Sequence, residues 1–199
     1  MLNKFYFGLL CTISFTFFSC NSNEESKTDN PSAPTNRTLV ETQNPSNDLM
    51  LLEKKVEQDS LNIKLRTILA ANYYSGKELN KAAYHFLKIY EMDAKNLIAL
   101  SNLGNIYYDS HQYDKAILFY EKALEIDAKN INMRSDLAVC YSNINKLKKA
   151  IQILKKNIKM DANHEKSHYN LSVILTQNGN VKEAEEEMKI YKTLISETK

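Results

Sequence analysis

The feature that most constrains this chain is an internal repeat of 34 residues. An Asp-Ala dipeptide that follows an apolar residue recurs at Asp93, Asp127 and Asp161, with 34 positions from each to the next. When repeats are started at residues 63, 97, 131 and 165, four Leu and four Ala residues fall into register (Leu69, Leu103, Leu137 and Leu171; Ala82, Ala116, Ala150 and Ala184). A fixed period of this length is typical of solenoid proteins, in which each repeat is one supersecondary unit that stacks on its neighbours.

The residue types within each repeat predict two packed helices. Small residues occupy positions 8 and 20, where they let the helices approach closely, and large residues at positions 7, 11 and 24 fill the surrounding space. We expect first helices at 63–75, 97–109, 131–143 and 165–177, and second helices at 79–92, 113–126, 147–160 and 181–195. Asn96 and Asn130 precede two first helices, where Asn is favoured as an N-cap.

This pattern resembles the tetratricopeptide repeat (TPR) family. The chain departs from the family at position 4, which lacks a large aromatic (Arg66, Leu100, Arg134 and His168), and at position 32, where Ala or Thr replaces Pro. The resemblance implies an all-α, right-handed α-solenoid of four helical hairpins (63–96, 97–130, 131–164 and 165–198). Residues 46–62 are predicted to form an N-terminal capping helix at Asp48–Gln58, as the second half of a partial repeat.

The C-terminal end of the array is open to two interpretations. No solvating helix follows the last repeat in the sequence. Either the run of three glutamates at 185–187 makes helix 181–195 its own cap, or Met188, Tyr191 and Leu194 form a self-association surface and the protein is a homo-oligomer.

The N-terminal residues predict export and a lipid anchor. Phe5–Phe18 is a 14-residue uncharged run after Lys4, too short for a membrane-spanning helix of ~20 residues but suited to a signal peptide. Ser19 and Cys20 resemble the end of a bacterial lipoprotein signal, which implies a signal peptide at 1–19 and lipidation of Cys20. Acyl chains on this thiol would hold the protein on a membrane. The alternatives are ordinary secretory cleavage and an uncleaved anchor.

The residues after Cys20 predict a sorting route and a tether. By resemblance to bacterial lipoproteins, Asn21 implies the outer membrane, and the acidic pair Glu24 and Glu25 resembles a surface-export signal. Both the periplasmic and the surface face of that membrane stay open. Residues 20–45 hold all three prolines and few apolar side chains, so we expect a disordered tether that spans roughly 25–30 Å.

Composition gives no support for nucleic-acid binding or for catalysis. The 26 basic and 24 acidic residues nearly balance, so no basic footprint for nucleic acid follows. Gly76, Gly104 and Gly179 are isolated and form no phosphate-binding loop. Cys140, the only cysteine within the repeats, is expected to be a small buried hydrophobe. We therefore predict no enzyme activity and no cofactor.

One segment, His164-Glu165-Lys166-Ser167-His168, matches the H-E-x-x-H pattern of zinc peptidases. It straddles a repeat boundary, where His164 takes the place of the capping Asn96 and Asn130. No third ligand is apparent, although catalytic zinc usually has three protein ligands. The interpretation is a chance match in a turn, with no metal site.

The first helices of TPR arrays line a concave groove, and the resemblance implies groove-facing side chains at positions 2, 5, 6, 9, 12 and 13. Ser135 occupies one of these positions and is expected to face the groove. We predict a peptide-binding groove formed by Tyr74, Ser101, Asn102, Asn105, Tyr108, Asp109, Asp136, Lys166, Tyr169 and Asn170. Asn amides can bond the backbone of an extended peptide, and Tyr adds rigid contact area. Asp136 argues against a basic clamp for a C-terminal carboxylate.

Three functions follow from the sequence, in order of preference. The first is a lipid-anchored protein–protein interaction scaffold of the bacterial cell envelope, an accessory subunit of an outer-membrane assembly or secretion complex whose partner is another envelope protein or an extended peptide. The second is a self-associating structural lipoprotein. The third is a zinc peptidase through His164 and His168.

Overall fold

The computed structural model describes residues 45–197, and within this range it contains helices and no strands. The helices are α1 (Pro45–Gln58), α2 (Ile63–Ser75), α3 (Leu79–Met92), α4 (Leu97–Asp109), α5 (Tyr113–Ile126), α6 (Ile131–Asn143), α7 (Leu147–Met160), α8 (Glu165–Gln177) and α9 (Val181–Glu197). The predicted all-α solenoid of four hairpins with an N-terminal capping helix is confirmed. Two ends differ, because α1 begins before the predicted Asp48 and α9 extends beyond residue 195.

The signal peptide, Cys20 and residues 21–44 of the tether lie outside the described residues. Between residues 45 and 197, no helix combines the length and the apolar character that crossing a membrane requires.

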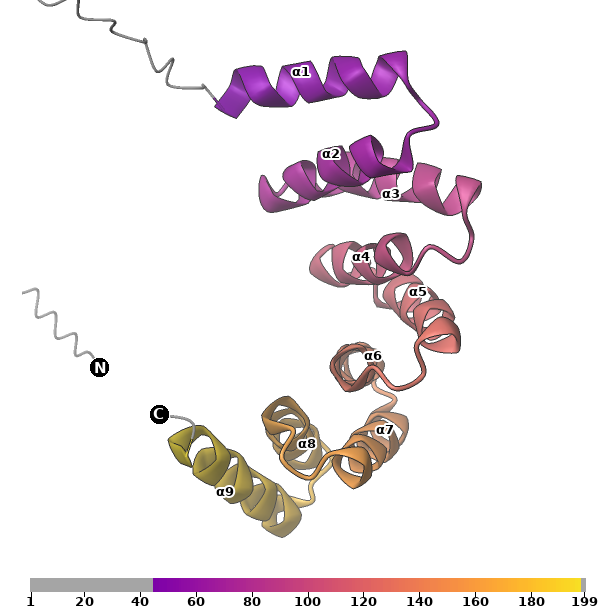
Figure 1. The fold of residues 1–199 in the computed structure, drawn as a ribbon. Coiled ribbons are helices and arrows are strands. Elements are labelled where there is room, and N and C mark those ends of the chain that lie inside the picture. The colour runs from indigo at the N-terminus through magenta and orange to yellow at the C-terminus, as the bar shows by residue number, and fades with distance from the viewer. Residues whose placement is uncertain (1–44, 198–199) are drawn as a thin grey trace, which may run out of the picture. The chain divides into compact units, whose positions relative to one another are not determined.

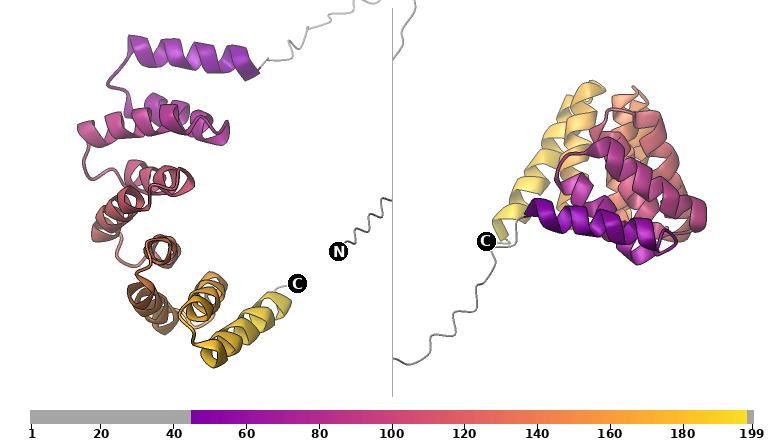
Figure 2. Two further views of the ribbon diagram at one scale, coloured as in Figure 1. Left: turned by 180° about the vertical axis from the view of Figure 1, so that it is seen from behind. Right: turned by 90° about the horizontal axis from the view of Figure 1, so that it is seen from above.

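The hairpins stack side by side into an arc (Figure 1). We call α2, α4, α6 and α8 the A helices and α3, α5, α7 and α9 the B helices. In Figure 1, α4, α6 and α8 line the inner side of the arc, while α5 and α7 lie on its outer side. Seen from above, α1 and α9 run in different directions, because each hairpin is rotated relative to the previous one (Figure 2).

The core lies where the repeat positions predicted it. All four Leu residues at position 7 and all four Ala residues at position 20 are buried. Gly104, at position 8, shows why this position must be small. A Cβ atom on Gly104 would lie 2.6 Å from the ring of Tyr120, so the A and B helices of repeat 2 approach closely only because the side chain is absent.

The turn before each A helix is closed by a side-chain cap. The Oδ1 atoms of Asn62, Asn96 and Asn130 accept hydrogen bonds from the backbone N–H groups three residues later, at 3.0–3.1 Å. The N-cap role predicted for Asn96 and Asn130 is therefore confirmed. His164 takes the same position before α8, where its side chain accepts a bond from Ser167 N–H.

Polar residues at position 4 stabilise the turn before the A helix, although the large aromatic residue of the TPR pattern is missing there. Arg66 donates from Nη2 to the Ser60 carbonyl at 2.7 Å, and Arg134 donates from Nη1 to the Ala128 carbonyl at 3.3 Å. His168 makes the same contact through Nε2 with the Ala162 carbonyl at 2.9 Å. Each side chain thus reaches the carbonyl six residues earlier and ties the preceding turn to the A helix. Repeat 2 has Leu100 at this position, which has no polar atom for such a tie.

Tyrosine at position 11 links neighbouring repeats. Tyr141 Oη donates to Glu121 on the preceding B helix, and Tyr73 Oη donates to Glu53 on α1. The two glutamates precede their tyrosines by the same 20 residues. Helix α1 therefore occupies the place of a B helix, as expected for the second half of a partial repeat.

Each turn between an A and a B helix contains one residue in the left-handed region of φ. This residue is always position 15, and its φ is 63° at Lys77, 58° at His111, 59° at Asn145 and 82° at Gly179. Glycine adopts such a φ without steric cost, and Asn adopts it more readily than other residues with a side chain. The Lys77 turn is therefore more strained than the Gly179 and Asn145 turns.

Candidate functional site: the concave surface

The candidate site is the side of the A helices that faces the inside of the arc. We call this the concave surface; it consists of the A-helix side chains that the B helices leave at least partly exposed. All ten predicted groove residues belong to this set, with exposure ranging from half-buried Asn105 to exposed Tyr169. Ser135 does not, because it is fully buried, and its expected place in the groove is wrong.

Two polar pairs on the concave surface join neighbouring A helices. Tyr74 Oη on α2 donates to Asp109 Oδ2 on α4 at 2.7 Å. Lys166 Nζ on α8 lies 2.6 Å from Asp136 Oδ1 on α6. These contacts bring four of the predicted residues together and hold their side chains in fixed positions. A surface ordered in this way loses less side-chain entropy when a ligand binds.

The pairing of Lys166 with Asp136 also bears on the type of ligand. A basic clamp for a C-terminal carboxylate needs cations that are available to the ligand. Lys166 already has Asp136 as its carboxylate partner, and Asp109 adds a second negative charge to the concave surface. This arrangement disfavours a terminal carboxylate as the ligand, as the sequence predicted.

A residue of the B helix of the same repeat orients the side chain of Asn105. Tyr120 is buried on α5, and its Oη donates to Asn105 Oδ1 at 2.6 Å. Tyr120 is the large residue at position 24 of repeat 2, which was predicted only to fill the core, so this contact was not foreseen. The signal was Gly104, since the missing side chain opens the path by which the Tyr120 ring reaches the concave side.

Two more predicted residues are oriented by bonds to their own helix. Asn102 Nδ2 donates to the Ile98 carbonyl at 2.8 Å, and Ser101 Oγ donates to the same carbonyl at 3.1 Å. The amide plane of Asn102 is therefore fixed relative to α4.

Two tyrosines of this surface, Tyr74 and Tyr108, have raised pKa values. Burial, together with the hydrogen bond to Asp109, raises the pKa of Tyr74 to about 12. Burial also raises the pKa of Tyr108. Both phenols therefore keep their proton at neutral pH.

Exposed apolar residues lie between these polar ones. Ile98 is 55% exposed and Tyr169 is 45% exposed. Val173 on α8 and Ile68 on α2 are exposed as well. Ile68 was missed in the predicted groove, although its position 6 in repeat 1 matches Asn102 and Asp136. At the other end of the surface, Asn170 Nδ2 is buried and has no hydrogen-bond partner among residues 45–197.

Both histidines of the H-E-x-x-H match form hydrogen-bonding contacts around the turn before α8. His164 contacts Ser167 Oγ through Nδ1 at 2.7 Å and Asn132 Oδ1 through Nε2 at 2.9 Å. His168 is buried, with Nδ1 at 2.5 Å from Glu187 Oε2 and Nε2 on the Ala162 carbonyl. All four ring nitrogens thus have partners, and His164 precedes the helix rather than sharing a face with His168. Within residues 45–197, no cluster of three His, Cys, Asp or Glu side chains could hold a metal ion.

Comparison with known proteins supports the repeat assignment. A family model described as the fourth ARM domain of tetratricopeptide repeat protein 21 matches residues 99–197. A crystal structure of MamA is 17% identical, with a TM-score of 0.71 over 75% of this chain and 88% of that chain. MamA from Desulfovibrio magneticus RS-1, from residue 41 to its end, is 17% identical with a TM-score of 0.72, covering 77% and 86%. No curated protein matches the chain.

At this level of identity the solved structures establish the fold. Residues 45–197 form an α-solenoid repeat protein. The repeats are TPR-like, and where the aromatic residue is missing at position 4, Arg66, Arg134 and His168 tie repeats 1, 3 and 4 to the preceding turns.

Proposed function

We propose that this protein is a lipid-anchored TPR scaffold of the bacterial cell envelope that binds an extended segment of a partner protein on its concave surface. The observation that supports this most directly is the pair of contacts between repeats, Tyr74 with Asp109 and Lys166 with Asp136. They give the inner side of the arc an ordered row of polar groups before any ligand binds.

The chemistry of the row suits an extended peptide. Asn102 and Asn105 carry amides that can bond a peptide backbone, and both are held in place by intramolecular bonds. Exposed Ile98, Val173 and Tyr169 offer contact area for apolar side chains. A ligand with alternating backbone and side-chain contacts along α4, α6 and α8 would use both kinds of group.

The proposed location rests on the sequence. Cys20 after Ser19 supports lipidation, and Asn21 supports the outer membrane. With a tether between the anchor and the array, the concave surface would be available to an envelope protein on either face of that membrane. We propose the role of an accessory subunit in an outer-membrane assembly or secretion complex.

We further propose that the protein is not an enzyme. The one motif with a catalytic precedent, His164 with His168, serves as a helix cap and a turn tie. The polar groups of the concave surface, as far as the structure describes them, include no nucleophile paired with a base.

The test is a crosslinked pull-down of the full-length protein from its native membrane. A variant with Ile98, Asn102 and Tyr169 changed to Ala removes exposed parts of the concave surface and spares Asn105, whose loss would leave buried Tyr120 without its acceptor. The matched control changes exposed Tyr84 and Leu118 of the B helices to Ala. A partner lost only in the concave variant supports the proposal, and a partner that persists there but is lost in the control places binding on the outer side.

The anchor is tested separately by growth with a labelled fatty acid. Label should appear on the protein and disappear in Cys20→Ser, which should also leave the membrane fraction. Equal labelling of both would exclude Cys20 as the lipidated residue without affecting the test of the concave surface.

A further inference from the structure

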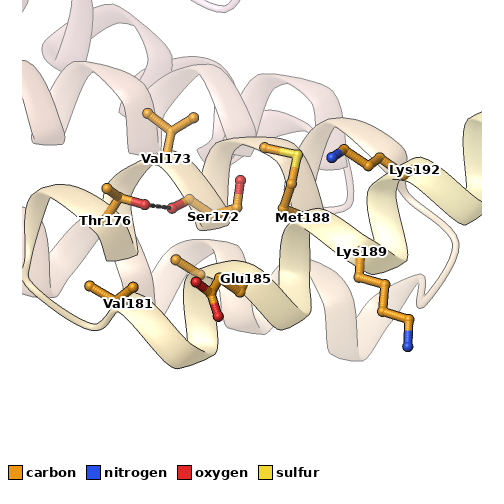
Figure 3. A pocket seen from close by; sticks show the side chains of 9 residues that line it. Ser172, Val173, Thr176, Val181, Glu185, Met188, Lys189 and Lys192 are labelled. Carbon is orange, nitrogen blue, oxygen red and sulfur yellow. Dashed lines mark hydrogen bonds between the residues drawn. The ribbon is translucent and has the colours of Figure 1, made fainter.

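Helix α9 ends the array with an open surface. In each internal repeat, the B helix packs against the next A helix (Figure 1). After α9 no such helix follows within the described residues. An open hollow of about 500 Å³ lies there, lined by Val173 and Thr176 of α8 and by Val181, Glu185, Met188 and Lys192 of α9 (Figure 3).

The residues of this surface differ from their internal counterparts in a specific way. In α7, which α8 covers, the positions of Glu185, Met188 and Lys192 are filled by Ile151, Leu154 and Ile158, all buried or half-buried. The last repeat keeps an apolar residue in the middle and replaces both isoleucines by charges of opposite sign. Small Ser172 and Ala184 are retained, so a helix can still approach closely.

These residues form a stripe whose charge pattern complements its own reverse. Along α9 the stripe runs Val181, Glu185, Met188, Lys192 and Ile195, with spacings of three or four residues that keep it on one helical face. Read forwards it is apolar, acidic, apolar, basic, apolar. When two such helices are antiparallel and cross at Met188, Glu185 of each copy faces Lys192 of the other, and Val181 faces Ile195.

Within the part of the chain that the structure describes, neither charge of this stripe forms an ion pair. The other glutamates of α9 that face the array have partners, since Glu183 pairs with Lys155 at 2.5 Å and Glu187 contacts His168 at 2.5 Å. Glu185 and Lys192 have no ion-pair partner among residues 45–197.

We propose that this surface binds a second copy of the chain, with the two α9 helices antiparallel about a two-fold axis near Met188. A two-fold interface uses the same patch on both subunits, so it requires a self-complementary pattern. The contact is centred on Met188 rather than on Tyr191, because Tyr191 packs on Tyr169 within the chain with a ring separation of 5.2 Å. An interface built on a single pair of helices is small, which places the dimer among weak associations. This proposal does not depend on ligand binding by the concave surface.

The experiment is sedimentation equilibrium of the full chain over a range of concentrations. The wild type should show a monomer–dimer equilibrium. Glu185→Lys and Lys192→Glu each place two pairs of like charges in the interface, and each should weaken dimerisation on the order of tenfold or more. Mixing these two variants should restore dimers, because in the mixed pair every 185–192 contact joins opposite charges. The double variant E185K/K192E should also dimerise.

Matched controls on the same helix are Glu186→Lys and Lys182→Glu, which make the same charge changes at exposed positions off the stripe. Both should dimerise as the wild type does. Three results would overturn the proposal: a wild type that stays monomeric at the highest concentration, single variants that dimerise as well as the wild type, or a mixture that remains monomeric. A monomeric wild type whose α9 is protected from hydrogen exchange by a different protein would assign the surface to that partner instead.

Discussion

The ring of Tyr120 occupies the space that a side chain on Gly104 would need, with 2.6 Å between the added Cβ and the ring atoms. In repeat 3 the same two positions hold Ala138 on the A helix and Leu154, which is smaller than Tyr, on the B helix.

We predict that Gly104→Ala lowers the free energy of unfolding by about 1–3 kcal/mol, the usual cost of overpacking. The change would otherwise favour a helix by about 1 kcal/mol, because Ala has the higher helix propensity. Urea unfolding measures the difference. In a Tyr120→Leu background, which copies repeat 3, the same substitution should be neutral or stabilising. An equal loss of stability in both backgrounds would show that the Tyr120 ring does not cause the destabilisation.

A second prediction concerns pH. His164 Nδ1 accepts the N–H of Ser167 at 3.2 Å, so the capping ring is neutral. Burial lowers the pKa of His164, and Asp161 and Glu165 raise it while Lys166 and His168 lower it further. Because the folded pKa lies below the unfolded value, this contribution to stability is present above pH 6.5 and is lost as pH falls through the lowered folded pKa.

The matched variant is His164→Asn, which copies the caps of the other repeats without a titrating group. Between pH 7.5 and 5, the wild type should lose more stability than this variant, by about 0.5–2 kcal/mol, the range for losing an N-cap. Chemical unfolding at each pH measures both proteins. Parallel stability curves would contradict the role assigned to His164.

The left-handed turn residues give a third prediction. Lys77→Gly should stabilise the protein by about 0.5–1 kcal/mol, because glycine adopts the φ of 63° without strain. Gly179→Ala should destabilise it by about 1 kcal/mol. No atom lies within 4 Å of an added Cβ at Gly179, so this cost reports backbone strain alone. Thermal unfolding should separate the two variants in opposite directions from the wild type.

The fourth prediction is that Cys140 is inert. Its side chain is fully buried, and burial raises the pKa of the thiol to about 12. In a variant with Cys11 and Cys20 changed to Ser, a thiol-specific reagent at pH 8 should react only at the rate at which the repeat unfolds. The reaction should accelerate with urea. Rapid labelling of the folded protein would mean that the α6–α7 region opens more readily than its packing indicates.

The helices were predictable because local and long-range signals agree in them. The spacing of Leu at position 7 and Ala at position 20 defined the hairpins, and Asn96 and Asn130 marked where A helices begin. The end of α9 was less predictable. The aspartates at position 31 are the C-caps of α3, α5 and α7, but Ile195 replaces Asp in the last repeat, so the helix continues to Glu197.

Contacts within the candidate site were harder to foresee. Ser135 has the position of a groove residue, yet it is buried, with its Oγ accepting from Asn157 Nδ2 of α7 at 3.0 Å and lying 3.1 Å from Ser167 Oγ of α8. The pairing of Tyr74 with Asp109 depends on the separation of two A helices, which the repeat register alone does not give. The sequence thus identified the surface but not its internal bonds.

The side-chain ties at position 4 distribute mechanical stiffness unevenly along the array. Arg66, Arg134 and His168 tie the turns before α2, α6 and α8 to the A helix, whereas Leu100 makes no such tie before α4, where Asp93 and the Asn96 cap hold the turn. We expect a bending force, such as the pull of a partner on a membrane-anchored array, to flex the molecule at the joint between α3 and α4. The first repeat and the capping helix would then rotate as one rigid unit relative to the other three repeats.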